Sequence, residues 1–195
     1  MRKDKELAAH PAWRKWRKFC YFLRAALIMF GTERIFSIGH LNPYERITLA
    51  MTMDGKRRRW SKGGDGYVER NPRYVEWVPS DGRLVDDNPL LRAGLTTSSL
   101  PVRLTPRNRQ KFIEDSLKRG DFFDAVVIGR GIAWGTLAGV LEQVAPLLLP
   151  STRFFLLGAK SPAQEALMRV LEQEGWTGGR IASLAVYERN GHGNG

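Results

Sequence analysis

The chain has 195 residues and a formal net charge of +11, and 43% of its residues are apolar. This length allows one medium-sized domain with a buried core, with or without a terminal extension. The single cysteine, Cys20, excludes an internal disulfide, and no apolar run reaches the length of a transmembrane helix. We therefore expect a cytoplasmic protein, with peripheral association with a membrane as a further option.

The positive charge predicts a polyanionic partner, which is either RNA or an anionic membrane surface. The alternative is a solvated basic surface that only keeps the chain in solution. The basic residues form three clusters along the sequence, within residues 14–24, 56–59 and 103–111. The contact with the partner is assigned to Arg14, Lys15, Arg17, Lys18, Arg57, Arg58 and Arg59.

The first predicted element is a helix that begins near Pro11 and ends at Gly31. Its apolar residues recur at steps of three and four, and the opposite face is cationic in its first half. Tryptophans beside lysines and arginines suit a helix lying in a membrane interface. The favoured interpretation is a helix packed across the edge of a sheet, with the aliphatic parts of its Arg and Lys side chains along apolar surface. Residues 1–33 are assigned to this N-terminal basic amphipathic extension.

The next segment begins with a short apolar strand, "ERIFSIGH", and is then ambiguous. Asn42-Pro43-Tyr44-Glu45 is typical of a helix start, with Asn as N-cap, Pro in the first turn and Glu closing a capping box. However, the alternating apolar residues of 47–53, followed by Asp54-Gly55, are typical of a β-hairpin. A helix over residues 43–53 is favoured because three cap features agree.

The middle of the chain contains two short strand candidates, "RYVEWV" and "LPVRLT", and a helix in "PRNRQKFIEDSLKRG". Residues 82–101 are rich in turn formers, with a short helix near Pro89–Gly94 as one option. The Asp86-Asp87 pair in this stretch is interpreted as a solvated turn. No histidine or cysteine spacing matches a metal site, so no metal is predicted.

The last third alternates strands and helices. "FFDAVVIG" and "TRFFLLG" are continuous apolar strands, as parallel sheets require. The helix "GTLAGVLEQVAPLLLP" is ended by its prolines, and the helix of 161–175 begins at Ser161 as N-cap. A single strand, "RIASLAVYER", is expected to close the fold. The order predicts right-handed crossovers and one domain over residues 34–190, with residues 191–195 as a disordered tail.

From Arg34 to Arg189 this order resembles that of the class I S-adenosylmethionine-dependent methyltransferases, in a divergent or degenerate form. The segments that carry the resemblance are "FFDAVVIG", "VLEQVAPLLLPSTRFFLLG" and "EALMRVLEQEGW". The resemblance implies an α/β fold: a Rossmann-like, mostly parallel sheet flanked by helices. It also implies S-adenosylmethionine as cofactor and methyl transfer as the activity.

The resemblance also implies a cofactor site at the ends of the first, second and fourth strands. Ser37 stands where the family has an acid, and Leu41 to Pro43 replace its further glycines. The ribose-binding acid corresponds to Glu76 or Asp81. The implied cofactor residues are Ser37, Gly39, His40, Asn42, Glu76, Asp81, Gly129 and Gly131.

Two residues of these loops are candidates for catalysis. His40 is a candidate general base, because a neutral imidazole titrates near working pH. Arg130, between two glycines after a strand, is a candidate for binding a phosphate or carboxylate. A methyltransferase acting on RNA, or on a substrate at an anionic membrane, is therefore the first hypothesis. The alternative is a non-catalytic, degenerate Rossmann-like domain that binds nucleic acid or serves in assembly.

Overall fold

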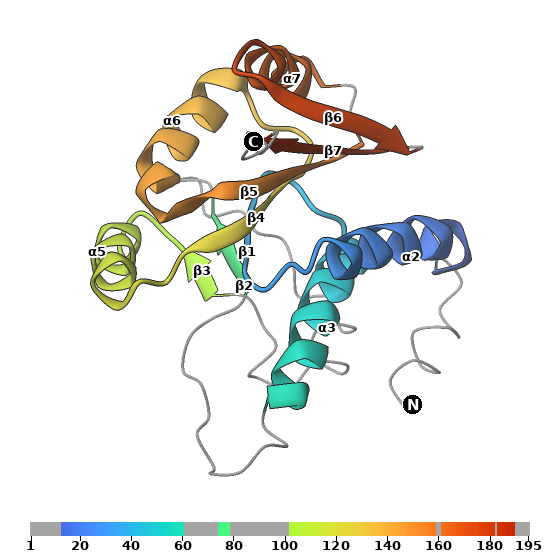
Figure 1. The fold of residues 1–195 in the computed structure, drawn as a ribbon, viewed down its shortest axis with the longest axis horizontal. Coiled ribbons are helices and arrows are strands. Elements are labelled where there is room, and N and C mark those ends of the chain that lie inside the picture. Colours follow the sequence, from blue (N-terminus) through green and yellow to red (C-terminus); the bar gives the residue numbers. More distant parts are fainter. Residues whose placement is uncertain (1–12, 61–73, 79–101, 159–160, 182, 190–195) are drawn as a thin grey trace, which may run out of the picture.

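The computed structural model describes residues 13–60, 74–78, 102–158, 161–181 and 183–189 (Figure 1). The α-helices of this part are α2 (Trp13–Met29), α3 (Pro43–Trp60), α5 (Arg109–Arg119), α6 (Trp134–Val144) and α7 (Pro162–Gln173). The strands are β1 (Ile35–Ile38), β2 (Tyr74–Trp77), β3 (Val102–Leu104), β4 (Phe123–Ile128), β5 (Leu148–Leu157), β6 (Trp176–Ile181) and β7 (Leu184–Arg189). A 3₁₀ turn, Ala145–Leu147, joins α6 to β5.

The strands form one seven-stranded sheet in the order β3-β2-β1-β4-β5-β7-β6. The strands β1 to β5 pair in parallel, whereas β7 pairs antiparallel with both β5 and β6. The predicted mostly parallel sheet is therefore confirmed. The continuous apolar run of β4 and of residues 154–157 of β5 follows from their place in the middle of the sheet, where both faces are covered.

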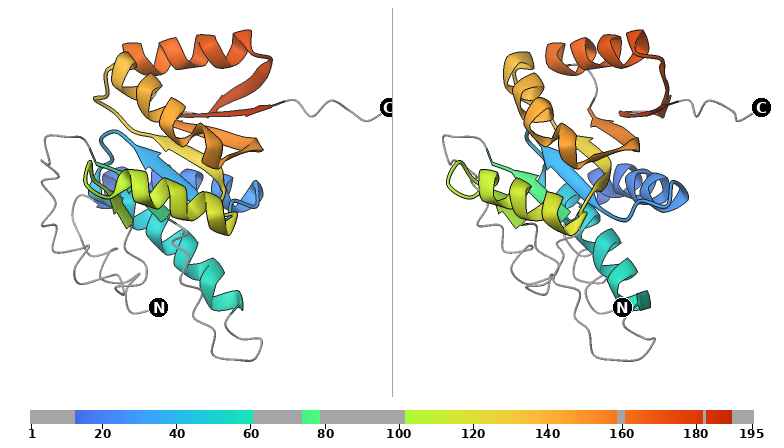
Figure 2. Two further views of the ribbon diagram at one scale, coloured as in Figure 1. Left: turned by 90° about the vertical axis from the view of Figure 1, so that its left-hand side faces the viewer. Right: turned by 60° about the vertical axis from the view of Figure 1, so that its left-hand side comes forward.

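Strand alternation divides the core into two layers, one on each face of the sheet. Phe36, Val126 and Ile128 face one layer, which is closed by Ile113 of α5, residues of α6 and residues of α7. The other layer is closed by α2 and α3, which lie on the opposite side of the sheet (Figure 2). Its members include Leu23, Leu27, Ile35, Leu49, Ala50, Met53, Val127, Phe155 and Leu157.

The N-terminal helix packs against the core of the domain as predicted, but it covers a face of the sheet and does not lie across its edge. Leu23 and Leu27 of α2 are fully buried in the layer shared with α3. The side chains of Arg14, Lys15 and residues 57–59 lie outside the described residues, as do Asp81, Asp86-Asp87 and the tail 191–195. None of the helices in the described ranges combines the length and the apolar character that crossing a bilayer requires.

The capping box of α3 forms as the sequence predicts. Asn42 Oδ1 accepts hydrogen bonds from the backbone N–H groups of Tyr44 and Glu45, at 2.9 and 3.0 Å. Glu45 Oε2 in turn accepts from the backbone N–H of Asn42 at 2.8 Å. Residues 43–53 are therefore helical, and the hairpin alternative is wrong, because the cap fixes the first turn before the alternating residues begin.

The expectation of a single closing strand is also wrong. The C-terminal segment forms a hairpin of β6 and β7, and β6 is the edge of the sheet. A Cβ added to Gly178 would lie 2.4 Å from the ring of Tyr187, so this aromatic ring covers the glycine on the neighbouring strand. Consecutive glycines at 178 and 179 hide the strand from a search for alternating apolar residues.

Asp121 links three parts of the fold and provides a test of acid stability. Its carboxylate accepts from Arg34 Nη1 at 2.6 Å and from Arg119 Nε at 2.7 Å. Burial by itself raises the pKa of Asp121, but the hydrogen bonds and charges of Arg119 and Arg34 outweigh it and hold the pKa below its ordinary value of 3.8. The carboxylate therefore stabilises the fold above pH 3.8, and this contribution is lost as the pH falls through the folded-state pKa.

We predict that Asp121→Asn destabilises the chain at neutral pH and much less in acid. The measurement is urea unfolding of both proteins at a series of pH values from neutral to about pH 3. The difference in free energy of unfolding should shrink as the pH falls. A difference that stays constant over this range would contradict the assigned role of the two arginines.

Candidate functional site

The candidate site lies at the carboxyl ends of β1 and β4. The chain proceeds from β1 to β2 on one side, while β4 lies on the other side of β1. Open α/β sheets bind ligands at such a point, where the strand order reverses and the loops diverge. The loops that follow are residues 39–42, which lead into α3, and residues 129–133, which lead into α6.

In this chain the two loops are hydrogen-bonded to each other instead of diverging. The backbone N–H of His40 donates to the carbonyl of Arg130 at 2.7 Å, and the N–H of Arg130 donates to the carbonyl of His40 at 2.9 Å. Gly129 adds a bond from its N–H to the carbonyl of Ile38 at 2.8 Å. We call this pair of residues the His40–Arg130 bridge, and it joins the two loops that follow β1 and β4.

The glycines of the two loops are explained by this close approach. A Cβ at Gly129 would lie 2.4 Å from the carbonyl oxygen of His40. Gly39 has a φ of +87°, and a Cβ there would lie 3.2 Å from the carbonyl oxygen of Arg130. Glycine at both positions is thus required by contact between the loops, and a bound ligand is not needed to account for it.

Arg130 forms an ion pair with Glu45, which lies in the first turn of α3. Its Nη1 and Nη2 each donate to Glu45 at 2.9 Å in a two-pronged ion pair, and Glu45 is fully buried. The guanidinium also lies 5.7 Å from the ring centroid of Trp16. The structure therefore gives Arg130 a structural partner. A role in binding substrate or a phosphate stays a prediction.

Glu76 faces the interior and not the edge of the sheet. Strand alternation in β2 directs its side chain toward α3, where Arg46 Nη2 lies 2.6 Å from Glu76 Oε1. The two side chains are only 2% and 1% exposed. Burial raises the pKa of Glu76, although the charges of Arg46, Arg103 and His40 oppose this rise. A ribose-binding role for Glu76 is untested, and in this arrangement its carboxylate is covered by α3.

The remaining predicted cofactor residues fall into two groups. His40, which is exposed, and Gly131, which has a φ of +67°, lie at the edge beside the bridge. Ser37 is buried one position below the edge, with its hydroxyl 3.5 Å from both Tyr74 Oη and the carbonyl of Val75. Asn42 serves as the N-cap of α3, and its Nδ2 is buried without a hydrogen-bond partner.

Sequence reasoning missed Gln164, which organises the same edge from the other side. This residue of α7 is fully buried, and its Nε2 lies 3.2 and 2.9 Å from the carbonyls of Ile128 and Gly129. It also lies 2.9 Å from the carbonyl of Leu157 at the end of β5. A glutamine in the first turn of a helix is usually solvated, so only the tertiary structure reveals this role.

Within the described ranges, no three histidine, cysteine, aspartate or glutamate side chains come close enough to hold a metal ion. The chemistry offered by the described part of this edge is that of backbone groups, the exposed imidazole of His40 and the Glu45–Arg130 ion pair.

Comparison with solved structures identifies the fold. The chain resembles one from Staphylococcus aureus that was assigned as a caffeoyl-CoA O-methyltransferase, with a TM-score of 0.58 and 12% identity over 96% of each chain. It also resembles an O-methyltransferase of tomaymycin synthesis from Streptomyces achromogenes, solved with S-adenosylmethionine, at a TM-score of 0.55 and 14% identity over 89% of this chain and 80% of that one.

A third similar structure is a TDP-rhamnose 3'-O-methyltransferase of calicheamicin biosynthesis, with a TM-score of 0.55 and 14% identity over 97% of this chain and 92% of that one. The sequence matches no protein-family model and no curated protein at a significant level. The fold is thus the Rossmann-like fold of the class I methyltransferases, as the sequence resemblance implied.

Proposed function

We propose that this chain is a methyltransferase-like protein that binds S-adenosylmethionine at the carboxyl edge of β1, β2 and β4. The observation that carries the proposal is the likeness, over almost the whole chain, to O-methyltransferase structures that include one solved with this cofactor. The order of the seven strands, with β7 lying antiparallel between β5 and β6, also supports the proposal.

The described residues fit the cofactor only in part. The left-handed turn at Gly39 and the start of α3 lie beside the expected crevice. The His40–Arg130 bridge joins the two loops at that crevice, and the carboxylate of Glu76 is turned toward Arg46. The arrangement does not offer an open cradle, so we infer that the bridge parts when the cofactor enters. His40 remains our candidate general base because its side chain is exposed at this edge.

The acceptor in this proposal is RNA or a substrate at an anionic membrane surface. The net charge of +11 supports either class, because both carry phosphate groups.

A second candidate function is a non-catalytic binding or assembly module. The observation that favours it is the closure of the site. The backbone bridge and the two ion pairs, Glu45–Arg130 and Arg46–Glu76, occupy groups that a cofactor would otherwise contact.

Calorimetry combined with hydrogen exchange distinguishes the two functions. We expect S-adenosylmethionine to give measurable binding heat and to speed exchange of the amide protons of His40 and Arg130, because these are the protons of the bridge. The amides of Glu188 and Arg189 lie at the end of β7 that is away from this edge, and their exchange should be unaffected. No heat and unchanged exchange at millimolar cofactor would contradict the methyltransferase proposal and support the non-catalytic module.

A further inference from the structure

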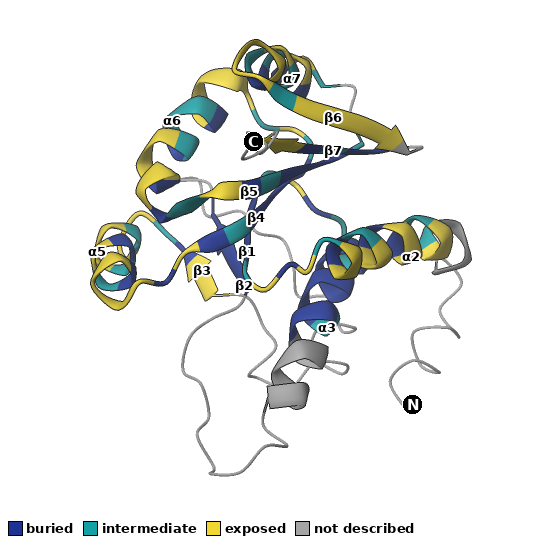
Figure 3. Ribbon diagram, in the orientation of Figure 1, coloured by how far each residue is buried: buried dark blue, intermediate teal, exposed yellow. Residues whose placement is uncertain are grey.

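One side of α2 is apolar and faces away from the core. We call this the outer face, and we define it by Tyr21, Phe22, Ala25, Ile28 and Met29. These residues are exposed, by 57% for Tyr21, 39% for Phe22, 54% for Ile28 and 73% for Met29. Figure 3 shows how much of the surface of α2 is exposed. The other side of the same helix buries Leu23 and Leu27 completely. Apart from the exposed Arg24, the second half of α2 is therefore apolar both toward the core and away from it, whereas the exposed side of a surface helix is normally polar.

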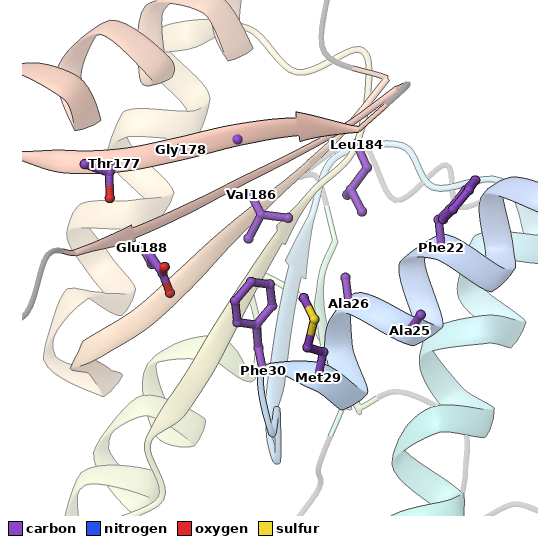
Figure 4. Close-up of a pocket in the computed structure, with 11 residues that line it drawn as sticks. Phe22, Ala25, Ala26, Met29, Phe30, Thr177, Gly178, Leu184, Val186 and Glu188 are labelled. Carbon is purple, nitrogen blue, oxygen red and sulfur yellow. The ribbon is translucent and has the colours of Figure 1, made fainter.

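A groove continues the outer face toward the C-terminal hairpin. It has a volume of about 630 Å³ and lies between α2 and the strands β6 and β7 (Figure 4). Phe22 and Met29 line it from α2, Phe30 lines it from the turn that follows, and Leu184 and Val186 line it from β7. At its polar end Glu188 is neutralised by an ion pair with Arg153 at 3.1 Å. Helix and groove together form one exposed apolar surface, which marks an interaction site on a soluble fold.

The first half of the same helix is cationic on the same side. Arg17 and Lys18 are exposed, and they precede Tyr21 and Phe22 by about one helical turn. Arg24 is also exposed and precedes Ile28 by about one turn. The exposed side of α2 therefore presents cations beside an apolar patch. This is the pattern of a helix that lies in the plane of a membrane surface.

We propose that the outer face of α2 docks on the surface of an anionic lipid bilayer. The side chains of Phe22, Ile28 and Met29 enter the boundary between headgroups and acyl chains, while Arg17 and Lys18 contact lipid phosphates. Aliphatic side chains such as Ile28 and Met29 gain little from RNA, where affinity comes from phosphate contacts and base stacking. A second copy of the chain would bring the same cations against one another. The inference does not depend on cofactor binding.

Vesicle flotation of the full chain tests the charge requirement. The chain should float with equimolar phosphatidylcholine and phosphatidylserine vesicles and not with phosphatidylcholine alone, and salt should weaken the binding. Replacing Arg17 and Lys18 by glutamine should lower the partition coefficient by about tenfold or more. The matched control removes the same charge from the exposed Lys111 and Lys118 of α5 and should have a much smaller effect.

The apolar requirement is tested by replacing Ile28 and Met29 with glutamine, which leaves the charge and the helix propensity nearly unchanged. We expect binding to fall about tenfold or more, because these side chains are the ones that insert. Leu117→Gln on α5, where Leu117 is 41% exposed, is the control for loss of an exposed apolar residue and should bind normally. Thermal unfolding of each variant verifies that it is folded.

Insertion is measured directly with an environment-sensitive dye on Met29→Cys. The native Cys20 is buried and its pKa is raised to about 11, mainly by burial, so its thiol should not compete for the label at neutral pH. The dye should shift to the blue with phosphatidylserine vesicles, and the same dye on Leu117→Cys should not.

Three results would overturn the proposal. The first is normal vesicle binding by the Ile28 and Met29 variant, which would leave only non-specific attraction by basic charge. The second is a dimer, seen by light scattering, that this variant abolishes, since a second copy would then cover the outer face. The third is binding to single-stranded RNA that depends on Ile28 and Met29 when vesicles are not bound.

Discussion

Arg46→Met by itself is expected to lower the free energy of unfolding by about 3–5 kcal/mol, which is the usual cost of leaving one member of a buried ion pair without its partner. The carboxylate of Glu76 would remain 1% exposed in β2, having lost the guanidinium that lies 2.6 Å away. Burial already raises the pKa of Glu76, and Arg46 opposes this rise, so the variant should raise it further. The destabilisation should therefore be larger at pH 8 than at pH 5, because an acid with a raised folded-state pKa destabilises the fold above its unfolded pKa.

The double variant Arg46→Met with Glu76→Leu is the matched control. Replacing both charges by apolar side chains removes the unpaired group, so most of the lost stability should return, to within about 1–2 kcal/mol of the original chain. Urea unfolding of the two single variants and the double variant gives the coupling between them. Additive losses, with no dependence on pH, would show that the two side chains do not interact as the structure indicates.

Gly129→Ala is expected to lower the free energy of unfolding by about 2–3 kcal/mol, because there is no room for a methyl group between Gly129 and the backbone of His40. Its Cβ would lie 2.4 Å from the carbonyl oxygen of His40, a backbone atom that cannot rotate away. The His40–Arg130 bridge must then shift, and its two hydrogen bonds must weaken. Faster hydrogen exchange at the amides of His40 and Arg130 should accompany the loss of stability.

Gly139→Ala is the control for the added methyl group. Gly139 lies inside α6, and a Cβ there meets nothing within 4 Å. Alanine at this position should stabilise the chain by about 0.5–1 kcal/mol, because it reduces the conformational freedom of the unfolded state. Equal effects of the two substitutions would contradict the close contact between the loops.

The parts of the fold that depend on local interactions could be predicted from the sequence. The start of α3 is set by residues 42–45, which bond to one another within a single turn. The start of α7 is likewise set by Ser161, whose hydroxyl oxygen accepts from the backbone N–H of Gln164 at 3.3 Å. The buried strands β4 and β5 could be predicted because a strand covered on both faces needs a continuous apolar run.

The sequence predicted where the candidate site lies in the fold, but not how its side chains are paired. The sequence places residues 39–42 and 129–131 at the carboxyl edge, because both follow buried strands of one parallel sheet. It does not show that Arg130 pairs with Glu45, since the two residues are 85 positions apart. The alternation of β2 determines that Glu76 turns toward α3, and the tertiary packing determines that it meets Arg46 there.

By itself, then, the sequence determined the order of the helices and strands apart from β6, the parallel core and the edge at which a ligand would bind, because these depend on neighbouring residues and on periodicity. The tertiary structure decided whether that edge is open. The His40–Arg130 bridge and the ion pairs Glu45–Arg130 and Arg46–Glu76 arise from contacts between distant segments, and such contacts have no local signature.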